Sequence, residues 1–212
     1  MNNMELVTLN KNSVVYFIII FNLLMLVGSK SFSQSVSASQ GSQLDYRILA
    51  TNKTSTMAKE LNEAGLIGYR FDSTMGGITA NGGKELVVVV SKRKDIQSKY
   101  SYKLLATSKT STMQKELQEA ADGGYLYRGQ SVYNSAFGGD EVICILERNE
   151  LNTEAKPNRM SYKVLATTKT STLQKEVQEA SAVGYEMIGM TVSKTAFGGS
   201  ELVAIMSRLE DQ

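Results

Sequence analysis

The chain contains no histidine and only one cysteine, Cys144, among its 212 residues. The absence of histidine removes the commonest general base and metal ligand from any active site. A single cysteine excludes an intramolecular disulfide, so stability must come from buried apolar side chains, which a chain of this length can supply. This scarcity of cysteine favours a bacterial exported protein over a small disulfide-bonded eukaryotic one.

The chain also lacks an excess of either charge. It has 23 basic and 21 acidic residues and a formal net charge of +2. The basic residues are spread among acidic ones, whereas nucleic-acid-binding proteins usually carry a clustered basic footprint. We therefore expect no nucleic-acid partner. The carboxylates show no spacing typical of a metal site, so we predict neither a metal nor a cofactor.

Long apolar runs are missing except near the N-terminus, between Val14 and Val27. That run is shorter than the roughly 20 residues of a membrane-spanning helix. Lys11 precedes it and three serines follow it, which is typical of a secretory signal peptide. We predict a signal peptide over residues 1–33, a disordered lead-in over residues 34–44, and no stable membrane span after cleavage. An uncleaved anchor is the alternative. The mature protein would be periplasmic or extracellular in a bacterium.

The chain contains one sequence unit that is repeated three times in tandem. The copies begin at Tyr46, Tyr102 and Tyr162, and they align without a gap over about 50 residues. Each runs through a Gly-Tyr pair to a Gly-Gly-x-Glu segment. We place the repeats at residues 45–94, 101–149 and 161–210. The linkers between them are short, and the second contains the only proline, Pro157.

The third copy predicts a β-α-β-β unit. Residues 162–167 are rich in β-branched and aromatic side chains and predict a strand. Leu173, Val177 and Ala180 have helical spacing, and Gly184 supplies the left-handed conformation that ends helices. Residues 185–194 and 201–208 predict two more strands, joined by a turn at residues 196–199 whose paired glycines permit positive φ. The fold class is therefore α+β.

The third strand of a unit is apolar on both faces, as in residues 86–90 and 142–146. Because alternate residues of a strand point to opposite faces, such a strand is buried on both sides and lies centrally. This predicts the strand order 1-3-2, with a right-handed helical crossover. One helix covers one face, and the other face needs a cover. We favour closure of the three repeats around a pseudo-threefold axis with these faces inward. The alternative is that two repeats pair and the third pairs with another chain, as in a homo-oligomer.

The chain resembles a bacterial family of small β-α-β-β modules that has no assigned activity. The resemblance rests on the opening Tyr-x-Val/Leu-Leu, on the helix ending Asn/Gln-Glu-Ala-x-x-x-Gly-Tyr, and on the arginine that ends a final strand (Arg148, Arg208). It covers all three copies, from Tyr46 to about Arg208. It implies the β-α-β-β fold and no site residue.

The Lys-Thr-Ser-Thr tract is the sharpest local motif, and it recurs between the first strand and the helix of each copy. Amide groups at a helix N-terminus attract anions, and a lysine with hydroxyl groups strengthens that attraction. The predicted topology places the glycine turn at the same edge of the sheet. The candidate anion or ligand residues are Lys53, Thr54, Ser55, Lys109, Thr110, Ser111, Lys169, Thr170, Ser171, Gly83, Gly139 and Gly199.

A simpler interpretation of this edge is structural. Ser111 with Gln114, and Ser171 with Gln174, match the capping-box pattern, whereas Ser55 is followed by Ala58. In this interpretation the hydroxyl groups cap each helix, and each lysine pairs with the glutamate after the glycines. Those glutamates are Glu85, Glu141 and Glu201. We favour this interpretation over a ligand site, and a protein contact is the third possibility.

Other residues that could carry chemistry have simpler structural interpretations. Cys144 aligns with Val88 and Ala204, which predicts a core position. The helix glutamates have lysines nearby and predict solvated ion pairs. The tyrosines that open each copy, and those that follow each helix, predict core or rim packing; a stacking platform for sugars is the alternative. These tyrosines are Tyr46, Tyr102, Tyr162, Tyr69, Tyr125 and Tyr185.

We therefore predict an exported, non-catalytic repeat protein that acts as a binding or assembly module of the cell envelope. The partner would be an envelope protein, a glycan or a second copy of the chain. One alternative is a small hydrolase or transferase that uses threonine, lysine and glutamate at the helix N-termini, including Thr112 and Lys109. Another alternative is a purely structural envelope component.

Overall fold

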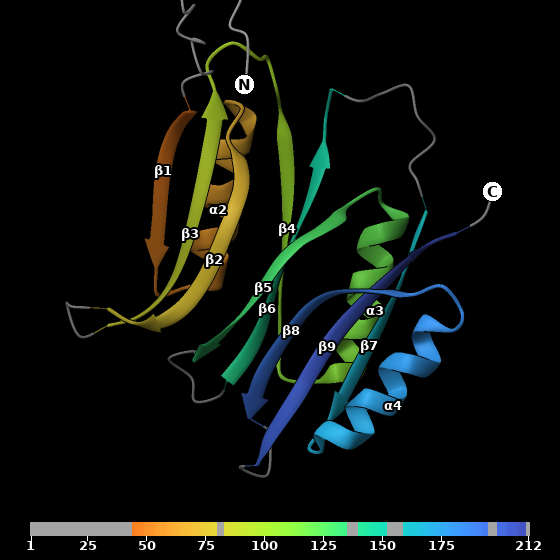
Figure 1. Cartoon of the computed structure of the whole chain (residues 1–212). Helices are drawn as coiled ribbons and strands as arrows, with labels where there is room; N and C mark the ends of the chain where they lie inside the picture. The colour runs from red at the N-terminus through yellow and green to blue at the C-terminus, as the bar shows by residue number, and fades with distance from the viewer. Residues whose placement is uncertain (1–43, 80–82, 135–139, 152–158, 195–198, 211–212) are drawn as a thin grey trace, which may run out of the picture. The chain divides into compact units, whose positions relative to one another are not determined.

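The chain folds into three β-α-β-β repeats, each a three-stranded sheet with one helix, as the sequence predicts (Figure 1). The computed structural model describes residues 44–79, 83–134, 140–151, 159–194 and 199–210. The predicted signal peptide and all of the lead-in except Leu44 lie outside the described residues. So do most of the glycine turns, including Gly139. No helix within the described ranges is long and apolar enough to cross a membrane.

The three repeats have the same element order. Repeat 1 consists of β1 (Leu44–Thr51), α2 (Thr54–Leu66), β2 (Arg70–Ile78) and β3 (Lys84–Arg93). Repeat 2 consists of β4 (Tyr100–Thr107), α3 (Thr110–Asp122), β5 (Leu126–Asn134) and β6 (Asp140–Asn149). Repeat 3 consists of β7 (Met160–Thr167), α4 (Thr170–Ser181), β8 (Glu186–Lys194) and β9 (Ser200–Leu209).

The predicted strand order is confirmed in all three sheets. Sheet A has the order β1-β3-β2, sheet B β4-β6-β5 and sheet C β7-β9-β8. Both edge strands of each sheet run antiparallel to the central one, so the two edge strands run parallel to each other. The register is also the same, since Tyr46 lies opposite Ser91, Tyr102 opposite Glu147 and Tyr162 opposite Ser207. Equivalent residues of the three repeats can therefore be compared one by one.

A glycine in the left-handed conformation follows the end of each helix, as the third copy predicts. Gly68, Gly124 and Gly184 have φ values of 93°, 79° and 87°, a left-handed conformation that other residues adopt at a cost. The tyrosine after each glycine donates its backbone N–H back into the helix. Tyr69 donates to Ala64, Tyr125 to Ala120 and Tyr185 to Ala180, at 3.0–3.2 Å. The chain thereby turns directly from the helix into the second strand.

The capping-box prediction is wrong. The residue at each helix N-cap is a lysine in extended conformation, and no side chain caps the helix. The serine is the second residue of the helix, two residues after the N-cap, where its hydroxyl is misplaced for a cap. The threonine that ends each first strand accepts the lysine N–H instead, as in the 3.1 Å bond from Lys109 to Thr107 Oγ1. Gln114, the expected capping partner, binds the following repeat.

Each of the first two helices lies between its own sheet and the sheet of the next repeat. Leu61 of α2 shares one apolar cluster with Val88 of β3 and Ile145 of β6. Leu117 of α3 likewise shares a cluster with Cys144 of β6 and Ile205 of β9. The face of sheets B and C that lacks its own helix is thus covered by the preceding repeat. The order of these layers is sheet A, α2, sheet B, α3, sheet C and α4 where the helices lie over β4 and β7, whereas β2 contacts β5 and β5 contacts β8 directly.

The favoured pseudo-threefold closure is therefore wrong, and so is the pairing of two repeats alone. Sheet B faces α2 and sheet C faces α3, so the repeats follow one another in series. The burial of the central strands is consistent with this serial order. Residues 142–147 of β6 are all buried, whereas Val87 and Val89 of β3 remain half-exposed. The two-sided burial predicted for the third strand holds in repeat 2 and fails in repeat 1, because nothing in the described chain covers sheet A.

Candidate functional site

The predicted Lys-Thr-Ser-Thr edge lies where the first strand of each sheet meets its helix. Lys53, Lys109 and Lys169 are exposed N-cap residues, followed by the threonine and serine of the first helical turn. The second strand ends at the same edge, since Gly76 and Thr51 both lie opposite Leu86 of β3. Gly83 and Gly199 flank the turn there. The structure thus places those predicted residues that it describes at a common edge within each repeat, and Gly139 lies outside the described residues.

The ion pair predicted at this edge is not found. None of the salt bridges among the described residues joins an N-cap lysine to Glu85, Glu141 or Glu201. The described residues also hold no group of ligands suited to a metal ion. The three edges carry positive charge at helix N-termini without a carboxylate partner in the described chain. Anion binding at this edge stays a prediction.

The structural interpretations of the other candidates are largely confirmed. Cys144 is fully buried, and this burial, with the nearby charge of Glu116, raises the pKa of its thiol to about 12. Three helix glutamates form solvated pairs four residues after a lysine, at 3.6–3.8 Å. Tyr102 and Tyr162 are buried as predicted. Tyr46, their counterpart in repeat 1, is 59% exposed, so the prediction of packing fails there.

The interface between repeats 1 and 2 pairs a helix side chain with the edge of sheet B. Asn62 of α2 accepts the backbone N–H of Tyr102 at 2.9 Å and donates to the Tyr102 carbonyl at 3.0 Å. Tyr102 belongs to β4, whose outward backbone groups have no neighbouring strand. Unpaired groups of this kind are a liability of edge strands, because buried polar groups need hydrogen bonds. The preceding helix therefore completes the edge of the sheet.

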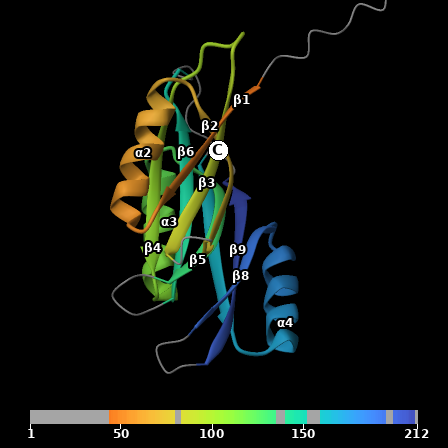
Figure 2. The ribbon, with the colours of Figure 1, turned by 90° about the vertical axis from the view of Figure 1, so that its left-hand side faces the viewer.

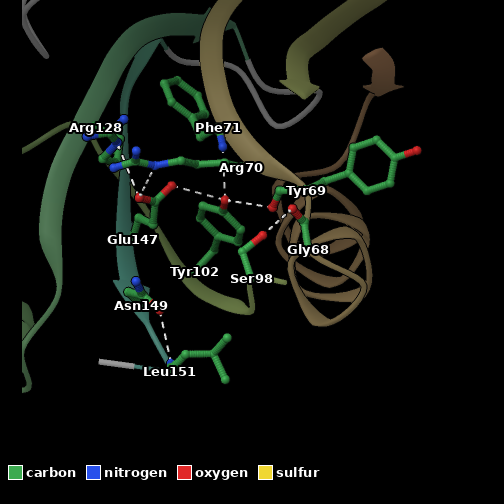
Figure 3. Close-up of polar contacts among 10 residues, drawn as sticks. All are labelled: Gly68, Tyr69, Arg70, Phe71, Ser98, Tyr102, Arg128, Glu147, Asn149 and Leu151. Carbon is green, nitrogen blue, oxygen red and sulfur yellow. Dashed lines mark hydrogen bonds and ion pairs between the residues drawn. The ribbon is translucent and has the colours of Figure 1, made fainter. Parts of the chain in front are cut away.

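Figure 3 shows a charged cluster at the same interface. Glu147 of β6 is 5% exposed and pairs with Arg70 at 2.9 Å and with Arg128 at 3.6 Å. Its second oxygen lies 3.1 Å from the hydroxyl of Tyr102, which accepts the backbone N–H of Phe71. Burial and the charge of Glu147 raise the pKa of Tyr102 above its ordinary value. The cluster joins strands of both repeats through charge-assisted hydrogen bonds.

The interface between repeats 2 and 3 uses two glutamines on α3. Gln114 donates to the Tyr162 carbonyl and accepts the Val164 N–H, both at 2.8 Å. Gln118 accepts the Tyr162 N–H at 3.2 Å and donates to the Met160 carbonyl at 3.1 Å. Four consecutive outward groups of β7 are thus paired by one helix. The hydroxyl of Tyr162 also accepts the Tyr127 N–H, as Tyr102 does from Phe71.

Sheet A presents the same kind of surface without a cover. We call its face away from α2 the open face of sheet A, formed by Tyr46, Ile48, Met75, Val87 and Val89. Tyr46, Ile48 and Met75 are 59%, 70% and 62% exposed. The equivalents of Tyr46 in sheets B and C, by contrast, are at most 5% exposed. The open face of sheet A is the candidate functional surface.

This surface, and the amide side chains that cover its equivalents, were not predicted from the sequence. One signal was available, because glutamine recurs four residues apart at Gln114 and Gln118 and again at Gln174 and Gln178. Such pairs share one side of a helix. Their function depends on a strand more than 40 residues away, which helical periodicity does not report. Comparison of the chain with protein-family models, with curated proteins and with solved structures found no match.

Proposed function

We propose that the protein is an exported, non-catalytic assembly module of the bacterial cell envelope that works by docking through the open face of sheet A. The observation that carries this proposal is the exposure of Tyr46 and Ile48, because the equivalents of Tyr46 are buried in sheets B and C and those of Ile48 are half-buried. Exposed apolar clusters mark interaction sites more often than chance surface.

An unpaired strand edge beside exposed apolar side chains is unfavourable in free energy. A strand edge with unpaired backbone groups beside exposed apolar side chains favours pairing with another surface. Soluble proteins usually protect such an edge with charges or proline. The charged residues of β1, Asp45 and Arg47, alternate with Tyr46 and Ile48 and so lie on the other face, which leaves the open face without a charge or a proline from β1. Sheets B and C show that this fold covers the edge with a helix. Assembly would give sheet A the same cover.

The test is chemical cross-linking in cells that export a tagged form of the full chain. The wild-type protein is expected in larger envelope complexes, and an Ile48→Asp variant is expected to lose them, because a carboxylate there would be buried without a partner. Ile96→Asp is the matched control, since Ile96 is also exposed but lies in the linker between β3 and β4. Complexes that persist in Ile48→Asp, or that are absent from the wild type, would contradict the proposal.

The non-catalytic part of the proposal has its own test. The purified chain is expected to show no turnover with general esterase, amidase and phosphatase substrates. Turnover that a Thr112→Ala or Lys109→Ala substitution abolishes would favour the hydrolase alternative instead. The screen would then place the activity at the helix N-termini rather than at the open face of sheet A.

A further inference from the structure

Helix α4 is the one helix whose outer side no following sheet covers in the described chain. Figure 2 shows it against β8 and β9, the strands of its own sheet. The positions of α3 that bind the next repeat are Gln114, Gln118 and Ala121, and all three are half-buried or buried. Their equivalents on α4 are Gln174, Gln178 and Ser181, and all three are exposed. The last helix therefore carries the equivalent side chains, and no sheet of the described chain lies against them.

These two glutamines have the chemistry that α3 uses. Gln114 and Gln118 pair four outward backbone groups of β7. Gln174 and Gln178 occupy the same helical positions, and their side-chain amides make no hydrogen bond with any other described residue. Their amide groups are therefore available to a strand edge of the same type.

Strand β1 has that edge. The carbonyl of Leu44, both backbone groups of Tyr46 and the N–H of Ile48 correspond by register to the four groups of β7 that α3 pairs. They face away from β3 and have no partner among the described residues. The side chains beside them correspond as well, because Tyr46, Ile48 and Ala50 stand where Tyr162, Val164 and Ala166 stand in sheet C.

We infer that the partner of the open face of sheet A is helix α4 of a second copy of this chain. This inference rests on the proposed function and names its partner. The contact would repeat between chains the helix-to-sheet contact that occurs twice within one chain. Because the two surfaces differ, the contact is heterologous, and each added copy leaves one of each surface free. The product is an open, head-to-tail series of copies.

One pair of residues at the proposed contact differs from the equivalent pairs within the chain, and this difference is compatible with the proposed contact. Within the chain, Gly129 and Gly189 lie close to the side chains of Phe71 and Tyr127, and a Cβ on Gly129 would be 2.9 Å from the Phe71 ring. Sheet A has Ser73 at the equivalent position. The residue of the second copy opposite Ser73 would be Met187, which is flexible and can make room for a Cβ where a rigid ring cannot.

The test mixes two single-cysteine additions to the full chain, Ile48→Cys and Gln174→Cys, with a short thiol cross-linker. Buried Cys144 does not compete for the reagent. A cross-linked heterodimer is expected only in the mixture. Lys175→Cys replaces Gln174→Cys in the control, because Lys175 is the neighbouring residue and is exposed. The double variant Ile48→Cys with Gln174→Cys is expected to give a ladder of multimers.

Sedimentation of the uncross-linked chain measures the same contact. Its mean mass is expected to rise with concentration. The double substitution Gln174→Ala with Gln178→Ala is expected to weaken association by about tenfold or more, and Ile48→Asp by about a hundredfold. A protein that stays monomeric, or a cross-link between two Ile48→Cys chains alone, would overturn the inference. If envelope complexes still depend on Ile48 but contain one copy of the chain, the proposed function stands and this inference fails.

Discussion

The two internal interfaces of this protein have the same geometry and different polar chemistry. Between repeats 1 and 2, one asparagine pairs the strand edge, and buried Glu147 binds two arginines. Between repeats 2 and 3, two glutamines pair the edge, and Ser207 takes the position of Glu147. Both interfaces bury the equivalent tyrosine and pair both of its backbone groups, and the second interface also pairs two further groups of the edge strand. What the fold requires is a satisfied strand edge and a covered apolar face, whereas the buried charge belongs to one interface only.

The apolar part of the comparison predicts the largest effect. Leu61 and Leu117 are fully buried at equivalent positions of α2 and α3. Truncation of either to alanine is expected to lower the free energy of unfolding by about 2–5 kcal/mol, from lost burial and the cavity left behind. Val177→Ala in α4 is expected to cost about 1 kcal/mol, because Val177 is only half-buried. Urea unfolding measures all three, and an equal loss at Val177 would contradict the series arrangement.

The charged cluster predicts a difference between the two interfaces. Glu147→Ala removes the carboxylate that Arg70, Arg128 and Tyr102 share, and we expect it to cost about 1–3 kcal/mol. The cost stays in this range because Arg70 and Arg128 are 49% and 33% exposed and can turn to water. Ser207→Ala is the matched control and is expected to change stability by less than about 0.5 kcal/mol. Equal effects would show that both interfaces depend on this position alike.

The amide side chains predict a smaller effect that the interfaces share. Asn62→Ala and Gln118→Ala each leave backbone groups of an edge strand without their partner, and we expect a loss of about 1–2 kcal/mol. Gln178→Ala is the control on α4 and is expected to leave the unfolding of the monomer unchanged. Thermal unfolding at low protein concentration makes this measurement. A loss at Gln178 in the monomer would mean that α4 already has a partner within the chain.

The smallest effect is expected at the helix N-termini. Lys53, Lys109 and Lys169 place positive charge at the positive end of each helix dipole without a carboxylate partner in the described residues. Replacing all three with glutamine is expected to raise the melting temperature slightly. Added inorganic phosphate should then stabilise the wild type no more than the variant. Stabilisation of the wild type alone would support the predicted anion site.

The repeats, the strand order and the helix ends were predictable because they depend on local patterns. A glycine after each helix and an apolar central strand are visible within one copy. The capping box failed because the serine lies only two residues after the N-cap position, and periodicity does not define a helix start that closely. The arrangement of the repeats failed for another reason. Two-sided apolar character shows that a strand is covered, and it does not say by which element.

The candidate surface could not be predicted from the sequence for a similar reason. Tyr46, Tyr102 and Tyr162 open nearly identical segments, yet only the first is exposed. The difference lies in the neighbouring element, because the helix of the preceding repeat packs against sheets B and C, whereas no helix of the described chain packs against this face of sheet A. Identical residues therefore have different environments, and no pattern within a copy distinguishes them.

The formation of three β-α-β-β units follows from the sequence, because strand and helix patterns act over a few residues. The covering of sheets B and C by the preceding helix, and the lack of a cover for sheet A and α4 among the described residues, follow only from the folded structure. Backbone groups and apolar faces need partners from segments 40 or more residues away in the sequence. The packing of whole sheets and helices decides which segment supplies each partner.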